Sequence, residues 1–262
     1  MFAEERQLLI ADLVTECGRV TVQDLASRFN VTPETVRRDL STLEDNGQLR
    51  RVHGGAVSSD RQSLSEPSLE ERQAQRLDEK SRIAAAALAL VPLDRTASVV
   101  LDAGTTTELL ADLLLNWCPT PGGDPLLVIT NAIPIAYKLS GTDAIQLHIL
   151  GGRVRGLTRA IVGRTTIEQL EALRPDIAFI GANGVHPVFG LSTPDSVEAG
   201  VKIAIVQSAR RVVALADSSK LGEETLVRFA SLGEIDTLIT DALPSPELAA
   251  ALAAADVEVV IA

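Results

Sequence analysis

The chain has 262 residues, enough for two domains with separate cores, and its 46% hydrophobic content argues against general disorder. Its formal net charge of −11 has the wrong sign for a protein that coats nucleic acid without sequence preference. Two cysteines, Cys17 and Cys118, are too few for a disulfide framework or a zinc site, and we expect both to be buried as small apolar side chains.

The first residues, MFAEERQLLI, lack the basic stretch and apolar core of a signal peptide. The longest uninterrupted apolar run, residues 83–91, is far shorter than the ~20 residues that a membrane-spanning helix needs. We therefore expect a cytoplasmic protein with no membrane partner. We expect neither a cofactor nor a metal ion.

Three helices are predicted at the start of the chain. The first covers Glu4 to Cys17, with Leu9, Leu13 and Cys17 on the face that packs against the other two. Apolar residues three and four apart mark the second helix and the inward face of the third: Val22, Leu25 and Phe29, then Val36, Leu40 and Leu43. The segment Asn30-Val31-Thr32 separates this pair.

The third helix has clear boundaries and an informative outer face. Thr32 is a good N-cap, Pro33 suits a first turn where its missing N–H costs nothing, and Asn46-Gly47 is a C-terminal signal. Its outward side chains are Glu34, Thr35, Arg38, Ser41 and Thr42, with Arg37 on the flank. Such a helix fits the DNA major groove, where Arg reads guanine edges and hydroxyls contact bases or phosphates.

A small β-hairpin is predicted directly after the third helix. Residues 49–52 and 56–57 form its strands, joined through His53-Gly54-Gly55, and cations lie at its base. The whole unit is then a winged helix-turn-helix, although a helical pair with a solvated face would share part of the pattern. The predicted DNA contacts are Thr32, Thr35, Arg37, Arg38, Ser41, Thr42, Arg50, Arg51 and His53.

Overall charge gives this unit little attraction for DNA. Residues 1–57 contain seven Arg and nine Asp plus Glu. Binding must therefore depend on where individual arginines lie and on a second copy doubling their number. Because one head makes few contacts with a specific site, we expect at least a dimer, either a homodimer or a homotetramer.

Composition changes after the predicted wing. We expect domains at residues 1–57 and 76–262, with a polar linker over residues 58–75 whose first part, Ser58 to Ser68, has no apolar periodicity. Leu69 to Leu90 is predicted to be helical. From Ala97 onward, seven apolar β-rich runs alternate with helical segments: ASVVLD, LLVIT, IQLHIL, DIAFIG, RVVALAD, DTLIT and VEVVIA. This alternation predicts an α/β domain with a mainly parallel sheet.

Polar clusters follow five of these runs. The sharpest, Asp102-Ala103-Gly104-Thr105-Thr106-Thr107, opens a predicted helix, where hydroxyls and free N–H groups suit a phosphate. An N-capping threonine cluster would have the same pattern. The other clusters begin at Thr130, Gly151, Gly181 and Asp217, and together they indicate a pocket at one edge of the sheet. Glu198 and Lys202, four apart on a helix, could equally form a surface ion pair, and His148 is predicted to be a core histidine.

Both halves of the chain resemble one family. TVQDLASRFNVTPETVRRDLSTLEDNGQLRRVHGGAV resembles the winged helix of the DeoR family of bacterial transcription regulators. DAGTTT, TNA, GGRVR, GANGV, GLSTPDSVEAGVK and LADSSKLG are similar to motifs of that family's sensor domain, whose fold is related to ribose-5-phosphate isomerase and glucosamine-6-phosphate deaminase. The resemblance implies a sugar-phosphate site formed by Asp102, Gly104, Thr105, Thr106, Thr107, Thr130, Asn131, Gly152, Glu198, Lys202 and Lys220.

The function expected from these features is that of a ligand-responsive transcription regulator, most simply a repressor of a carbohydrate-metabolism operon. Its partners would be double-stranded operator DNA and a phosphorylated sugar. The alternative is an active sugar-phosphate isomerase fused to a DNA-binding head. Related isomerases carry acidic residues in the segment that matches residues 179–184, which here reads FIGANG and has none. Without a carboxylate base to move the proton, we expect ligand binding but no turnover and no catalytic residues.

Overall fold

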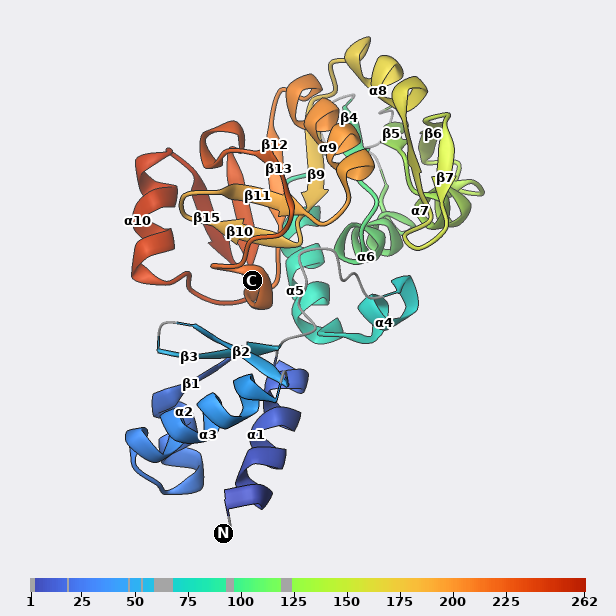
Figure 1. The fold of residues 1–262 in the computed structure, drawn as a ribbon. Coiled ribbons are helices and arrows are strands. Elements are labelled where there is room, and N and C mark those ends of the chain that lie inside the picture. The colour runs from blue at the N-terminus through green and yellow to red at the C-terminus, as the bar shows by residue number, and fades with distance from the viewer. Residues whose placement is uncertain are drawn as a thin grey trace. The chain divides into compact units, whose positions relative to one another are not determined.

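The computed structural model describes residues 3–17, 19–46, 48–52, 54–58, 68–92, 97–118 and 124–262. The chain forms two compact units, residues 1–65 and 66–262, which are described separately (Figure 1). The second unit begins at Glu66, so residues 69–75, which the sequence assigned to a linker, belong to a folded unit. Residues 59–67, most of the polar segment, lie outside the described residues.

The described residues of the first unit form three helices and a small antiparallel sheet of strand order β1-β3-β2. In chain order its elements are α1 (Ala3–Cys17), β1 (Arg19–Thr21), α2 (Val22–Phe29), α3 (Pro33–Asp45), β2 (Leu49–Val52) and β3 (Gly55–Ser58). The predicted helices and wing are confirmed, and β1 adds a third strand that the sequence pattern did not indicate. Thr32 accepts a hydrogen bond from the Thr35 N–H as the N-cap of α3.

The inward face of α1 differs from the prediction. Ile10 and Val14 are fully buried against α2, α3 and the sheet, whereas Leu9 is 46% exposed. The side chain of Cys17 lies outside the described residues. The prediction placed the helix stripe one residue off, because Leu9 and Ile10 are both apolar and periodicity alone does not choose between them.

A buried ion pair ties α1 to α3. Arg6 Nε donates to Asp39 Oδ2 at 2.6 Å, and Arg6 Nη2 donates to Asp39 Oδ1 at 3.1 Å. Gln7 Nε2 donates to the same carboxylate at 3.1 Å. Both charged side chains are almost fully buried, so this contact fixes α1 on the helix whose outer face was predicted to read DNA.

The second unit is built on a seven-stranded sheet of order β15-β14-β12-β9-β4-β5-β6 in which every pairing is parallel. All seven predicted strands are present: β4 (Ser98–Leu101), β5 (Leu126–Thr130), β6 (Ile145–Ile149), β9 (Ile177–Gly181), β12 (Val212–Leu215), β14 (Thr237–Thr240) and β15 (Glu258–Ile261). The predicted α/β fold is confirmed. Successive strand residues such as Val99 and Val100 enter separate cores on opposite faces of the sheet.

Helices cover both faces of this sheet (Figure 1). One core contains residues of α5 (Leu77–Leu88), α6 (Thr105–Leu114) and α7 (Ile133–Leu139). The other contains residues of α8 (Arg164–Glu171), α9 (Ser196–Ser208) and α10 (Pro246–Ala254). The sheet is therefore buried on both sides, which explains why its strands read as continuous apolar runs.

The predicted helix over Leu69 to Leu90 is broken in two. Helix α4 (Leu69–Ala74) ends at Gln75, and α5 begins after Arg76, whose φ of 54° is left-handed. The Arg76 guanidinium contacts Asp217 and Asp241, both at 3.2 Å, and donates to Ser218 Oγ at 2.7 Å. These partners, 141 to 165 residues away in sequence, hold the break in place.

Antiparallel strands beside the main sheet were not predicted. A hairpin of β7 (Arg153–Arg155) and β8 (Ala160–Val162) follows β6. A second small sheet consists of β10 (Gly184–His186), β11 (Gly190–Thr193) and β13 (Val227–Ala230). The short 3₁₀ turns are η1 (Ser218–Lys220) and η2 (Leu232–Glu234). Most of these strands, such as RVR, GVH and GLST, contain polar residues or glycine and lack the continuous apolar runs that mark the strands of the main sheet.

Two predictions about buried side chains were wrong. His148 is exposed rather than in the core, because β6 is an edge strand of the sheet. Cys118 is also exposed, after the end of α6. The apolar strand around His148 suggested burial, as did the residue type of Cys118. Only the position of each residue at the margin of the fold shows otherwise.

Candidate functional site

The outer face of α3 carries the side chains that the sequence singled out. Arg38 is exposed, and within the described part of the chain its guanidinium has no hydrogen bond or ion pair. Arg37 is also exposed but forms a 3.1 Å ion pair with Glu34 one turn earlier. An arginine without an internal partner keeps all its donors available for a base edge or a phosphate.

Hydroxyl groups flank Arg38 and connect the helix to the wing. Arg51 Nη1 of β2 donates to Ser41 Oγ at 2.6 Å, and the Arg51 N–H donates to Glu44 Oε1 at 2.8 Å. Thr32 and Thr35 share a 2.9 Å hydrogen bond at the start of the helix. Exposed Thr42 donates to the Arg38 carbonyl at 3.2 Å. The wing is thereby held to α3; His53 and the side chain of Arg50 lie outside the described residues.

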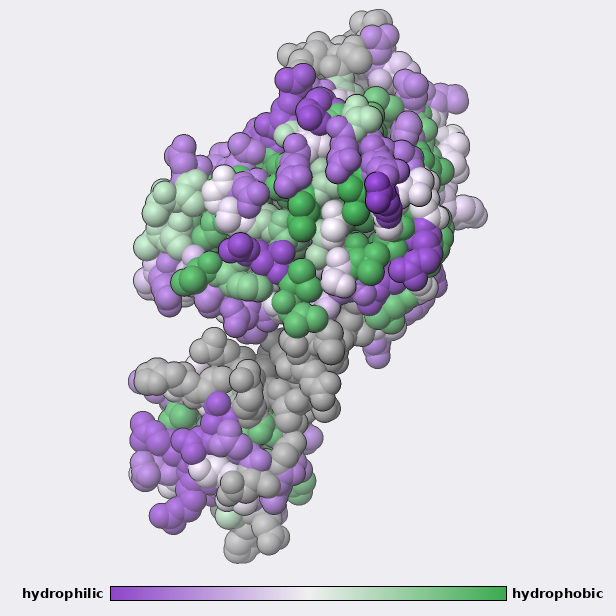
Figure 2. All heavy atoms as spheres, turned by 45° about the horizontal axis from the view of Figure 1, so that its top comes forward, coloured by the Kyte–Doolittle hydropathy of each residue, from purple (hydrophilic) through white to green (hydrophobic). Residues whose placement is uncertain are grey.

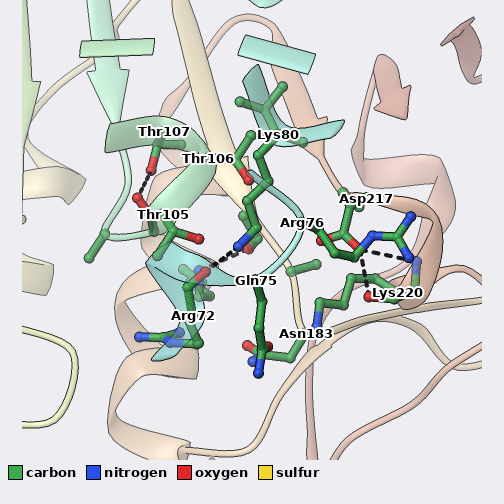
Figure 3. Close-up of a pocket in the computed structure, with 18 of the residues that line it drawn as sticks. Arg72, Gln75, Arg76, Lys80, Thr105, Thr106, Thr107, Asn183, Asp217 and Lys220 are labelled. Atoms are coloured by element: carbon green, nitrogen blue, oxygen red, sulfur yellow. Dashed lines mark hydrogen bonds and ion pairs between the residues drawn. The ribbon is translucent and has the colours of Figure 1, made fainter. Parts of the chain in front are cut away.

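A pocket in the second unit opens at the carboxyl ends of three neighbouring strands, β4, β9 and β12, beside the first turn of α6 (Figure 3). This is where ligands of parallel α/β sheets bind. Seven of the predicted effector residues line it: Gly104, Thr105, Thr106, Thr107, Glu198, Lys202 and Lys220. The Thr107 hydroxyl is used within the fold, because it donates a hydrogen bond to the Asp102 carbonyl at 2.7 Å.

Beneath this pocket, Asp102 and Lys202 form a buried ion pair between the end of β4 and α9. Burial raises the pKa of the Asp102 carboxyl above its ordinary value, and the adjacent Lys202 ammonium opposes that rise. Lys202 Nζ also donates to the Gly181 carbonyl at 2.9 Å, and the Gly181 N–H donates to Asp102 at 3.3 Å. Asp102 itself does not line the pocket; it holds Lys202 and the β9 end in position.

The other acidic residue of α9 is paired as well. Glu198 is buried and accepts hydrogen bonds from Arg155 Nη1, at 3.2 Å, and from the Thr158 hydroxyl, both in the β7–β8 hairpin region. Arg155 also contacts Asp195, the N-cap of α9, at 3.1 Å. Glu198 and Lys202 therefore have separate partners and do not form the surface ion pair that their spacing allowed.

Three other predicted effector residues lie outside the pocket. Thr130 donates to the Leu101 carbonyl at 2.7 Å. Asn131 accepts from the Ala103 N–H at 3.1 Å and donates to the Ile161 carbonyl at 3.2 Å. These two side chains support the loop after β4 from behind. Gly152 lies against Thr166 and Ile161 with a φ of 155°, where a Cβ would stand 2.2 Å from the Thr166 hydroxyl.

Four pocket residues were missed entirely, because they lie in and beyond the predicted linker. They are Arg72 in α4, Gln75 at the C-terminal end of α4, Arg76 between the two helices, and Lys80 in α5. The three cations are spaced four residues apart, which is the one sequence signal that could have indicated a common face. Asp217 and Ser219 of the η1 segment and Asn183 after β9 complete the polar lining.

The pocket is suited to a small anion with hydroxyl groups. Cations line it from α4, α5, α9 and η1, and the N–H groups of the first turn of α6 lack intrahelical acceptors. Among the described residues, the hydroxyls of Thr105 and Thr106 and the amides of Gln75 and Asn183 have no side-chain hydrogen bond. These groups can accept and donate to a bound molecule.

An arginine-bearing helix face and a basic strand-end pocket in one chain define a helix-turn-helix regulator with an α/β sensor domain. The comparisons agree with this class. Residues 6–62 match the DeoR-like helix-turn-helix domain, and residues 75–242 match the DeoR C-terminal sensor domain. The chain belongs to the DeoR family of transcriptional regulators.

Curated relatives match over nearly their whole length. The transcriptional regulator FruR of Bacillus subtilis is 36% identical, covering 92% of each chain. The glycerol-3-phosphate regulon repressor of Escherichia coli is 32% identical over 90% of this chain and 89% of its own. The lactose phosphotransferase system repressor of Streptococcus mutans is 34% identical over 92% and 93%. These relatives are regulators of transcription.

Among solved structures, ribose 5-phosphate isomerase A from Methanocaldococcus jannaschii aligns with 56% of this chain and 55% of its own. The alignment has a TM-score of 0.40 and 22% identity. Within the residues that the structure describes, none of the helices combines the length and the apolar character needed to cross a membrane.

Proposed function

We propose that the chain represses a carbohydrate-metabolism operon by binding its operator, and that a phosphorylated sugar or related phosphate ester controls this binding from the strand-end pocket. The observation that carries the proposal is the pocket itself, where cations and the first turn of α6 surround unpartnered hydroxyl and amide groups. The names of the relatives, repressors of glycerol-3-phosphate and lactose systems, support the same class of effector.

Binding without turnover is part of this proposal. An isomerase needs a carboxylate that is available to move a proton. The two carboxylates that line the pocket have structural partners, because Arg155 holds Glu198 and Arg76 holds Asp217. Beneath the pocket, Lys202 holds Asp102. The pocket therefore supports a sensor more than a catalyst.

A ligand screen tests the effector. The purified chain is heated with ribose 5-phosphate, glucose 6-phosphate, fructose 1-phosphate, fructose 6-phosphate or glycerol 3-phosphate, each against inorganic sulfate at equal ionic strength. A compound that binds only the native state raises the melting temperature of the second unit. The same compounds are then titrated into a complex with an operator selected from random DNA. If none shifts melting or DNA affinity, the proposed effector class is wrong; conversion of any sugar phosphate would favour the isomerase.

Arg38 is proposed to contact the operator from the outer face of α3. Arg38→Ala should weaken operator binding by about 1–3 kcal/mol if a bidentate guanine contact is lost, and reduce discrimination at that base pair. Since the side chain is exposed and unpartnered among the described residues, the head should melt as before. Fluorescence anisotropy with operator and scrambled DNA measures both affinities.

Arg164→Ala is the matched control for that variant. It removes the same charge from an exposed helix position in the second unit. Operator affinity should stay at the wild-type value. Equal operator binding by Arg38→Ala and the wild type would contradict the major-groove assignment.

We further propose that two or more copies associate and present paired heads to a two-fold operator. Large apolar side chains remain exposed on the second unit, among them Tyr137, Val188 and Leu243, each more than 80% exposed. Figure 2 shows apolar groups interspersed with polar ones over that unit. Light scattering should give the mass of a dimer or tetramer; a monomer at micromolar concentration would contradict this part.

A further inference from the structure

Lys80 has an unusual environment for a lysine. It lies in the first turns of α5 and is only 6% exposed. Figure 3 shows its side chain reaching into the middle of the pocket, between the threonines of α6 and Arg76. Its ammonium group donates to the main-chain carbonyl of Arg72, in the last turn of α4. Lys80 therefore joins the two helices across the break at Gln75 and Arg76.

The carbonyl of Arg72 needs such a donor. In a continuous helix it would accept from the N–H of residue 76, but the left-handed Arg76 ends the pattern. The Gln75 N–H instead closes the helix on the Glu71 carbonyl at 3.1 Å. The Lys80 side chain replaces the missing helical hydrogen bond, so the last turn of α4 depends on it.

The Lys80 ammonium has no direct ion-pair partner among the described residues, whereas Lys202 is paired with Asp102. Burial lowers the pKa of Lys80 to about 8. Lys220 of η1 and the arginines at 72 and 76 lower it further, and Asp217 opposes them. The facing residues of α6, Thr105 to Thr107, are uncharged.

We propose that Lys80 is a direct ligand of the effector phosphate, and that on binding it exchanges the Arg72 carbonyl for a phosphate oxygen and so releases the last turn of α4. This inference rests on the proposed function. The exchange is favourable because an ammonium–phosphate hydrogen bond is charge-assisted on both sides, and a bond to a neutral carbonyl is not. Helix α4 is the first helix after the segment that leads from the DNA-reading unit, so the exchange would change the structure where the two units connect in sequence.

Proton uptake gives a direct test in the wild-type chain. A dianionic phosphate beside Lys80 raises its pKa, so binding at pH 8 should take up about half a proton. The ester itself contributes little, because its second pKa of about 6 leaves it dianionic in both states. Above pH 8 the affinity should fall as binding must protonate Lys80. Calorimetric titration with each of the five phosphate esters, in two buffers of different ionisation enthalpy, measures both effects.

Variants assign the proton to Lys80. Lys80→Met keeps an unbranched apolar stem without the ammonium group. It should abolish the uptake while weakening ester binding on the order of ten- to a hundredfold. Arg82→Met is the matched control, since it removes a cation from an exposed position of the same helix that does not line the pocket. It should behave as the wild type. Binding by the wild type without proton uptake at any pH within about one unit of 8, or equal affinity in Lys80→Met, would overturn the assignment of Lys80.

Amide hydrogen exchange tests the release of α4. In the wild type, the peptide covering residues 69–76 should exchange faster when a bound ester is present. In Lys80→Met that peptide should exchange faster already and should not respond to the ester, because the donor to the Arg72 carbonyl is gone. Unchanged exchange in the ester-bound wild type would overturn the release. Failure of all five esters to bind the wild type would instead overturn the proposed function, and this inference with it.

Discussion

Thr106→Asp should abolish the response to phosphate esters. Thr106 is the second residue of α6, lines the pocket and is 8% exposed. A carboxylate there would occupy the region proposed for the phosphate, and such like-charge contacts cost several kcal/mol in a partly desolvated site. An acidic residue in the first turn is favourable to the helix itself, so the second unit should still fold. Operator binding titrated with each ester measures the loss.

Thr106→Asn isolates the effect of the charge. It has the same shape as Thr106→Asp but is neutral, so it should retain a response at a moderately higher ester concentration. Both variants should bind the operator without ester, because the DNA-reading unit has its own core. If Thr106→Asp responds at the wild-type ester concentration, the phosphate does not bind at the start of α6.

Asp39→Ala should destabilise the DNA-reading unit by about 3–5 kcal/mol, because it leaves the buried Arg6 guanidinium without its carboxylate partner. Such a loss is a large fraction of the stability of a small domain. Operator binding should therefore fail although Asp39 does not face outward. Calorimetry should show an early melting transition for this unit and an unchanged one for the second.

A double variant separates the ion pair from the packing. Arg6→Met with Asp39→Leu replaces both charges by apolar side chains, and such replacements of buried pairs are often neutral or stabilising. The double variant should recover the melting temperature and most of the operator affinity. A single Asp39→Ala variant that melts like the wild type would show that the pair contributes nothing.

The amino-acid sequence determined the elements that depend on local patterns. The Thr32-Pro33 start of α3, its exposed Arg38 and the seven strands of the parallel sheet were all predicted, because caps, helical spacing and doubly buried apolar runs are local signals. The sequence also predicted that polar residues following these strands would lie together at one edge of the sheet. Parallel strands bring their carboxyl ends to one edge, so DAGTTT after β4 and Lys220 after β12 had to lie near each other.

Tertiary structure decided which side chains reach the pocket and which ones support it. Three predicted effector residues form hydrogen bonds behind the pocket: Asp102, Thr130 and Asn131. Three cations line the pocket instead, Arg72, Arg76 and Lys80. They come from a segment that the sequence predicted to be a linker followed by an uninterrupted helix. The break between α4 and α5 directs those cations into the pocket. Ion pairs of Arg76 with Asp217 and Asp241, more than 140 residues away in sequence, hold this break in place. The left-handed conformation of Arg76 has no signal in the neighbouring sequence, because it is stabilised by contacts that exist only after the sheet has formed.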